Sequence, residues 1–345
     1  MEGKVKDIEY VLTVYIICFL VGLPFNLVAC YAFLKKVRQK PTPTDILLFS
    51  LTVSDLLLLF FLIFKIVEAA SNMTWPEPLP KFLCPLTNFF FYSSIYLSTL
   101  FLMGISVERY LCIAFPVKYK LNRKPTYTII ASVFFLFLAC AHCGSIVYAV
   151  EYHNVTASFH KDTCYVEFSK DQLKILLPFR LELCIVLFCL PLLITLFCYI
   201  SVIYRLTTMP NIPPHKKKRA VGLAVATVLN FAIAFAPYNI SHIAGYIQEK
   251  SPSWREITFT LTTLNTVLDP VIFYFSSTTF RRIFRDCWLG ISLLGFPSRS
   301  PPRIDNIPCR GAEGLMGWPG ISTKPSLYSS AFKPFFPMLE WTVPF

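Results

Sequence analysis

The stretch Ile46–Val67, ILLFSLTVSDLLLLFFLIFKIV, decides the fold class of this chain. It is apolar along almost its whole length and holds one acid, Asp55, and one base, Lys65. A helix needs about 20 apolar residues to cross the hydrocarbon core of a bilayer. A soluble helix would interrupt such a run with polar residues facing water. The stretch therefore predicts a membrane-spanning helix.

Six further apolar runs resemble this one. The 345-residue chain is 55% hydrophobic and 15% charged, whereas soluble domains carry about 25% charged residues. The composition excludes a soluble enzyme, and the net charge of +12 gathers in short clusters rather than on a nucleic-acid surface. The runs are too long and too evenly apolar for barrel strands, so we predict an all-α, seven-helix membrane bundle. The predicted spans are Tyr10–Leu34, Ile46–Val67, Phe82–Phe115, Tyr127–Val150, Ile175–Ile203, Val221–Ile247 and Ile257–Phe275.

The basic residues set the orientation of the bundle. Lys and Arg gather in the first, third and fifth loops and after the last span, and such loops are cytoplasmic. Residues 1–9 are therefore predicted to be extracellular and not a cleaved signal peptide. The membrane domain, 10–288, is expected to end in a short amphipathic eighth helix with Cys287 as a palmitoylation candidate. The Pro-rich segment 289–345 is expected to be a disordered cytoplasmic tail.

The outer loops carry two further signals. Asn72 and Asn154 begin N-x-S/T sequons in loops assigned to the outside, so we expect glycosylation there. Asn239 begins a third sequon inside a span and should stay unmodified. Cys84 and Cys164 are the only cysteines at the outer face, where the medium is oxidising. They either pair or stay free thiols, and the oxidising medium favours the pair.

Ionisable residues close the third span at the inner face. Such residues are rare in membrane helices and mark function. Glu108, Arg109 and Tyr110 follow one another there, and Tyr199 lies opposite in the fifth span. Arg109 alone could snorkel to lipid head groups. Its neighbours favour a switchable ion pair instead.

A polar set is expected at mid-depth. Asp55 and Asp269 supply two carboxylates, and Ser98 and Asn265 should lie at a similar depth. Their oxygens could ligate a hard monovalent cation such as sodium. A hydrogen-bonded seam that packs the helices explains the same residues equally well.

A basic set is expected at the outer ends of the spans, around Arg180 and Arg255. Two like charges repel strongly where the dielectric constant is low, and a carboxylate would relieve this by bidentate contact with arginine. Alternatively, Arg180 pairs with Glu182 or Glu167, and Arg255 with Glu256 or head groups. The other members of the set are Tyr92, Tyr96, His142, Tyr238 and His242.

Taken together, residues 8–288 resemble the rhodopsin-like (class A) G-protein-coupled receptors. The resemblance implies that Arg109 and Tyr199 help open the G-protein cleft and that Cys84–Cys164 is the family's outer disulfide. It also implies a plasma-membrane receptor, surrounded by membrane lipids, with a heterotrimeric G protein and arrestin as partners. The matching motifs are Asn26, Leu51–Asp55, Glu108–Tyr110, Pro191 with Tyr199, Phe235–Pro237 and Asp269–Pro270.

The chain departs from that family's pattern at several positions. Leu136 stands where span four usually has Trp, and Phe235 where span six has Trp before its proline. Span seven reads Asp269-Pro270-Val-Ile-Phe273, and Phe273 lacks the usual tyrosine hydroxyl. Span six begins with Lys216–Arg219, which includes no acid to lock Arg109.

Four stretches are similar to the short-chain free fatty acid receptors, types 2 and 3. That resemblance implies that Arg180, Arg255 and His242 hold the carboxylate of acetate, propionate or butyrate. It implies pocket positions for Tyr96, Tyr238 and His142, and coupling to Gi/o or Gq proteins. The stretches are Phe64–Ser71, Leu177–Glu182, Pro237–His242 and Ser251–Arg255.

Two rival functions remain open at this stage. A carboxylate transporter could use Asp55, Asp269 and Arg109, although the internal symmetry usual in transporters is absent. A receptor for hydroxycarboxylic acids or nucleotides would need further polar groups in the pocket. No HExxH, GxSxG or phosphate-loop motif favours an enzyme.

Overall fold

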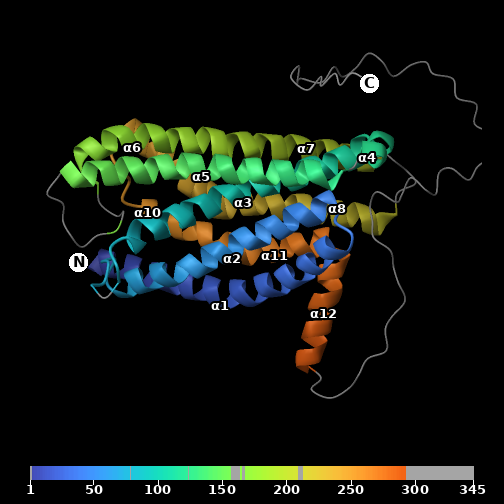
Figure 1. The fold of residues 1–345 in the computed structure, drawn as a ribbon, viewed down its shortest axis with the longest axis horizontal. Coiled ribbons are helices and arrows are strands. Elements are labelled where there is room, and N and C mark those ends of the chain that lie inside the picture. The colour runs from blue at the N-terminus through green and yellow to red at the C-terminus, as the bar shows by residue number, and fades with distance from the viewer. Residues whose placement is uncertain are drawn as a thin grey trace, which may run out of the picture. The chain divides into compact units, whose positions relative to one another are not determined.

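The computed structural model describes residues 2–77, 79–122, 124–156, 164, 168–208 and 213–292, all within the first of the chain's two units, Met1–Cys309. Every regular element among these residues is a helix (Figure 1). The first four predicted spans are each a single helix, and a short helix lies on the inner loop after the third. These elements are α1 (Glu2–Gln39), α2 (Pro43–Ala70), α3 (Leu83–Ala114), α4 (Pro116–Asn122) and α5 (Pro125–Thr156).

Spans five and six each contain a π-helical segment that ends two residues before a proline. Pro191 follows one segment and Pro237 the other. Proline lacks an N–H group and its ring clashes with the carbonyl of the residue four positions earlier, and one wider turn relieves both problems. The chain therefore accommodates these two prolines with π-turns. The elements are α6 (Lys170–Leu183), η1 (Cys184–Cys189) and α7 (Leu190–Thr208), then α8 (Pro214–Asn230), η2 (Phe231–Phe235) and α9 (Ala236–Gln248).

The seventh predicted span is a broken helix. It consists of α10 (Arg255–Leu261), a 3₁₀ turn η3 (Thr262–Leu264) and α11 (Asn265–Ser276). Within the described part of the chain, six helices are long and apolar enough to cross a membrane, and this segmented one is not among them. Its pieces are short, and Asn265, Asp269 and several threonines interrupt its apolar run.

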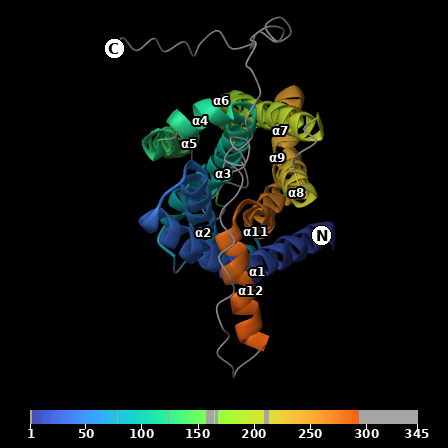
Figure 2. The same cartoon turned by 90° about the vertical axis from the view of Figure 1, so that its right-hand side faces the viewer.

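Helix α3 lies at the centre of the bundle. It packs against α2, α5 and α7, while α11 packs against α1 and α8 (Figure 2). Asn26 ties α1 to α11, because its Nδ2 donates to the carbonyl of Thr266 at 2.8 Å. Apolar side chains of α5 such as Phe137, 69% exposed, point away from the bundle. Such a surface is suited to lipid rather than to water.

Both ends of the membrane domain extend beyond the predicted boundaries. The first helix starts at Glu2, so residues 2–9 continue the helix of the first span beyond its predicted start. The eighth helix, α12 (Thr278–Ser292), follows α11 and runs across the bundle's inner end (Figure 1). It buries Phe280 and packs Phe284 against Phe25, with ring centroids 5.6 Å apart. The predicted tail lies outside the described residues from 293 onward.

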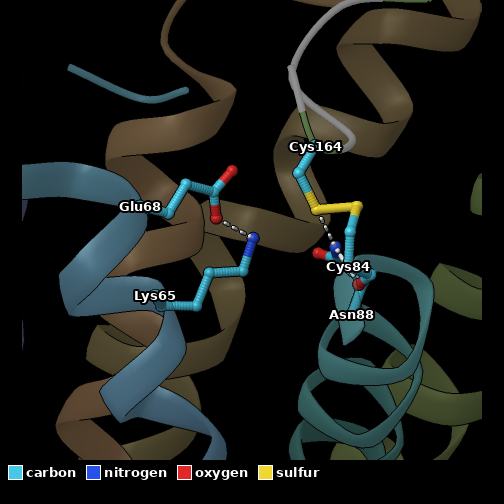
Figure 3. The surroundings of a disulfide bond; sticks show 5 residues. All are labelled: Lys65, Glu68, Cys84, Asn88 and Cys164. Atoms are coloured by element: carbon cyan, nitrogen blue, oxygen red, sulfur yellow. Dashed lines mark hydrogen bonds and ion pairs between the residues drawn. A yellow bond between two sulfur atoms is a disulfide. The ribbon is translucent and has the colours of Figure 1, made fainter. Parts of the chain in front are cut away.

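The outer face contains the predicted disulfide. Cys84 at the start of α3 is bonded to Cys164 of the outer loop, which confirms the pairing (Figure 3). Asn72 is exposed in the turn after α2 and adopts a left-handed backbone, φ 57°. Asn154 lies in the last turn of α5, and its side chain is outside the described set. Asn239 is fully buried, so its sequon is inaccessible. Glycosylation of Asn72 and Asn154 stays a prediction.

Candidate functional site

A cavity at the outer end of the bundle brings together residues of α3, α6 and α9. The space between its lining atoms is about 330 Å³ when the open solvent at its mouth is counted, so the cavity itself is small. In α6, Leu176, Arg180 and Leu183 follow at helical spacing, so they share one inward face. Two members of the predicted basic set that line the cavity, Arg180 and His242, are only 5% and 1% exposed. The lining is Tyr92, Ile146, Phe168, Leu176, Arg180, Leu183, Tyr238 and His242.

Aromatic residues fix the imidazole of His242. Its Nε2 lies 3.1 Å from the hydroxyl of Tyr96, which is fully buried beneath the cavity. The rings of His242 and Tyr238 meet edge to face, with centroids 4.4 Å apart. Phe259 of α10 packs against both Tyr238 and Tyr92. Two pairs of residues four positions apart thus converge from two helices: Tyr92 and Tyr96 from α3, and Tyr238 and His242 from α9.

The two arginines have different partners. Arg255, 2% exposed, forms an ion pair with the adjacent Glu256, which is one of the alternatives stated above. Arg180 donates to the hydroxyl of Ser251 at 3.5 Å. Within the described part of the chain, no carboxylate lies within ion-pair distance of Arg180; Glu167 is outside that part. The outer site therefore retains net positive charge at Arg180.

His142 differs from its predicted place. Its Nδ1 contacts the carboxylate of Glu182 on α6, 2.9 Å from Oε1, and His142 does not line the cavity. Glu182 therefore pairs with His142 and not with Arg180. The two residues link α5 to α6 on a partly exposed face, with side chains 27% and 38% exposed.

The structure contains a buried ion pair next to the site that was not predicted from the sequence. Lys65 Nζ lies 2.9 Å from Glu68 Oε2 on α2, near the outer disulfide (Figure 3). The Lys65 ammonium also lies 5.9 Å from the ring centroid of Phe259. The i, i+3 spacing of Lys and Glu was the available signal.

The mid-depth polar set is assembled as predicted. Asn265 Nδ2 donates to Asp55 Oδ1 at 3.5 Å and to Ser98 Oγ at 3.3 Å. Asn230, which the sequence did not single out, donates to Asp269 at 2.6 Å. All five residues are fully buried. Asp55, Asn265 and Asp269 each have a buried oxygen without a hydrogen-bond partner in the described part of the chain, and such oxygens fit a hard cation.

At the inner end, Glu108 and Arg109 turn to different partners. Arg109 Nη2 donates to the carbonyl of Ser276, the last residue of α11, at 3.2 Å. Glu108 accepts a hydrogen bond from Tyr119 at 2.5 Å. Tyr199 bonds Thr227 of α8 at 3.1 Å.

Two aromatic rings complete this inner end. Tyr110 packs against Phe197, with ring centroids 5.7 Å apart. Phe273, fully buried, packs edge to face against Phe33 at 5.3 Å. An apolar contact thus replaces the tyrosine hydroxyl usual at that position.

Arg219 supplies a contact that sequence reasoning missed. Its Nη2 donates to the carbonyls of Phe275 at 2.9 Å and Ser276 at 3.5 Å, and its Nε donates to Phe275 at 3.2 Å. Arg219 is on α8 and Phe275 is near the end of α11, so the contact joins spans six and seven. The last carbonyls of a helix lack intrahelical partners and carry partial negative charge, which is why a guanidinium fits there.

A segmented seven-helix bundle with a basic outer cavity and an arginine at its inner cleft defines a seven-transmembrane receptor. The family model described as 7 transmembrane receptor (rhodopsin family) matches residues 25–273, and the chain belongs to that family. The membership predicted from the motifs is therefore confirmed, together with seven membrane spans. The family is one of receptors and not a class of enzymes.

Three relatives stand out among proteins of known name. The chain is 52% identical over 278 residues to free fatty acid receptor 2 of Homo sapiens, covering 79% of this chain and 83% of that protein. It is 49% identical over 294 residues to free fatty acid receptor 2 of Mus musculus, covering 84% and 87%. It is 47% identical over 274 residues to free fatty acid receptor 3 of Mus musculus, covering 79% and 84%.

Proposed function

We propose that this protein is a plasma-membrane receptor for short-chain carboxylates such as acetate, propionate and butyrate. One observation carries the proposal: the buried guanidinium of Arg180 has no carboxylate partner in the described part of the chain and lines a small cavity beside His242. An aliphatic carboxylate supplies the missing charge, and Ile146, Leu176 and Leu183 receive its tail. Relatives named as free fatty acid receptors support the same ligand class.

Ligand size limits the affinity. The best very small ligands gain about 1.5 kcal/mol per heavy atom. Acetate and propionate can then gain at most about 6 and 7.5 kcal/mol, or dissociation constants of about 40 and 3 μM. Dehydrating the carboxylate and ordering the arginines weaken binding further. The receptor thus reports abundant acids, at tens of micromolar to millimolar concentration.

A dose–response series tests this function in transfected cells. Straight-chain acids from formate to octanoate, dodecanoate, lactate and 3-hydroxybutyrate are applied while G-protein activation is recorded. Potency should peak between acetate and valerate and then fall, because the cavity is small and Tyr92 and Tyr238 are part of its wall. A nanomolar response, or a preference for dodecanoate or for the hydroxy acids, would overturn the assignment. Uptake of labelled acetate without G-protein activation would favour the transporter.

The inner cleft is proposed to bind an inhibitory Gi/o heterotrimer, or Gq, and arrestin afterwards. Arg109 and Tyr199 already contact α11 and α8, the helices that must separate to admit a partner. Pertussis toxin separates the two G-protein classes, because it blocks only the inhibitory one.

The mid-depth set is proposed to hold an allosteric sodium ion. The unpartnered oxygens of Asp55, Asn265 and Asp269, together with Ser98, would supply the ligands. Sodium in place of N-methylglucamine should then lower propionate potency in the wild type and leave that of Asp55→Ala unchanged. Equal sodium sensitivity of the two would favour the alternative, a packing seam.

A further inference from the structure

The outer loop contributes an aromatic ring to the carboxylate site. Phe168 lines the cavity, and its ring centroid lies 4.8 Å from Cζ of Arg180 and 5.5 Å from Cζ of Arg255. One ring therefore contacts both guanidiniums, although the three residues come from a loop, α6 and α10. No local sequence pattern predicts this contact, because it joins segments far apart in the chain.

The first turn of α6 anchors the backbone beside this ring. Phe168 directly precedes Ser169, the N-cap of α6. Ser169 Oγ accepts from the Gln172 backbone N–H at 3.2 Å, and Gln172 Oε1 accepts from the Ser169 N–H at 2.9 Å. This reciprocal capping fixes the chain at the helix start. The residue before it is held to the same helix that carries Arg180.

A ring and a carboxylate would hold two arginines in different ways. A ring face attracts cations, and more strongly when they are withdrawn from water, as Arg180 and Arg255 are. It accepts no strong N–H···O hydrogen bond and adds no net charge. A carboxylate in the same place would take the N–H donors and neutralise the charge. Arg255 also has Glu256, so Arg180 depends more on the ring.

We infer that Phe168 is a positioning residue of the carboxylate site: its ring holds the Arg180 and Arg255 guanidiniums in place without using the N–H donors of Arg180 that the ligand needs. The inference rests on the proposed function above. Arginines that are already ordered before the ligand arrives lower the entropic cost of ligand binding. Potency for every short carboxylate should therefore depend on the electron density of this ring.

Ring fluorination tests this without changing shape. Phenylalanine carrying one, two or three ring fluorines is placed at position 168 of the full receptor by stop-codon suppression, and propionate potency is measured at matched surface expression. Fluorine withdraws charge from the ring face, so potency should fall stepwise, by about tenfold at three fluorines. The control is the same series at Phe91, which packs on Phe259 and has no cation over its ring in the described part of the chain.

Ordinary substitutions provide a second measurement. Phe168→Tyr should keep potency within about threefold, and Phe168→Leu should lose about tenfold. Phe168→Glu should lose more than Phe168→Leu, because its carboxylate competes with the ligand. A flat fluorine series, an equal slope at Phe91, or wild-type potency in Phe168→Glu would overturn the inference. A wild-type receptor that ignores every acid from formate to octanoate would instead overturn the proposed function.

Discussion

Arginines occupy both ends of this helix bundle, buried at the outer end and half-buried at the inner end, and their partners differ in kind. At the outer end, Arg180 and Arg255 contact the ring of Phe168. At the inner end, Arg109 and Arg219 donate to backbone carbonyls at the end of α11. A ring uses none of the N–H donors of Arg180, whereas the carbonyls use those of Arg109 and Arg219. Arg180 can therefore receive an anion, while the inner arginines already hold helices together.

The inner arrangement explains how this chain manages without an acid at the start of span six. The segment Lys216–Arg219 is wholly basic, so it cannot form an ion pair with Arg109. Instead, Arg219 uses the carbonyls of Phe275 and Ser276, and Arg109 uses that of Ser276. Arg219 thus links α8 to the end of α11, and Arg109 links α3 to the same end. Opening the inner cleft requires that these bonds break.

The largest effect is expected where the ligand itself replaces a missing partner. Arg180→Ala should lower propionate potency at least about a hundredfold, because hydrogen bonds to charged groups contribute about 1.5 to 3 kcal/mol each and a bidentate pair is lost. Arg180→Lys should recover little, since an ammonium cannot fork. Lys174→Ala is the control, because Lys174 lies on the same helix with a side chain 76% exposed. Unchanged potency in Arg180→Ala would show that the outer arginines are structural.

Replacing Arg109 should reduce G-protein signalling and leave ligand binding nearly unchanged. Arg109→Ala is expected to reduce the maximal G-protein response at least about tenfold, since a charged donor in the cleft is lost. Binding of a labelled carboxylate probe at the outer site should stay within about twofold, because coupling between sites acts through the conformational equilibrium. Both are measured on the same membranes. A normal response would mean that the inner end works without this arginine.

Replacing Arg219 should have a smaller effect, and it should raise signalling where the Arg109 substitution lowers it. Arg219→Ala removes the bonds from α8 to the carbonyls of α11, so the closed form loses stability. The site is partly exposed, so we expect basal signalling without ligand to rise only about fivefold. Lys218→Ala removes the same charge from an exposed neighbour and is the control. An equal change in both variants would attribute the effect to loop charge and not to the carbonyl contact.

The spans were predictable because bilayer thickness translates directly into apolar run length. The breaks inside them were less so. A proline marks where a backbone carbonyl loses its hydrogen-bond partner. Whether the helix then bends or forms a π-turn, as it does before Pro191 and Pro237, depends on packing. The seventh span was predicted as one run, yet the threonines of η3 and the polar Asn265 divide it.

Within the candidate site, pairs on one helix were predictable and pairs between helices were not. Tyr238 and His242 share a face because they are four residues apart. His142 was misplaced because the rotation of α5, which turns it toward Glu182, leaves no local trace in the sequence. Arg219 was missed because its acceptors are backbone carbonyls, which every residue has.

The seam that Arg219 fastens also contains Gly222, one turn further along α8. A Cβ at Gly222 would lie 2.5 Å from Cε1 of Phe275, so either the ring must move or α8 and α11 must separate. Because a side chain can yield, Gly222→Ala should raise basal signalling by only about twofold. Phe275→Leu removes the ring. The double variant Gly222→Ala/Phe275→Leu should therefore have the same basal signalling as Phe275→Leu alone. Gly144→Ala is the matched control, since its Cβ would meet Phe89 at an ordinary 3.5 Å. If Gly222→Ala and Gly144→Ala behave alike, the α8–α11 seam does not set the resting state, and the inner arginines would have to be explained by the G-protein contact alone.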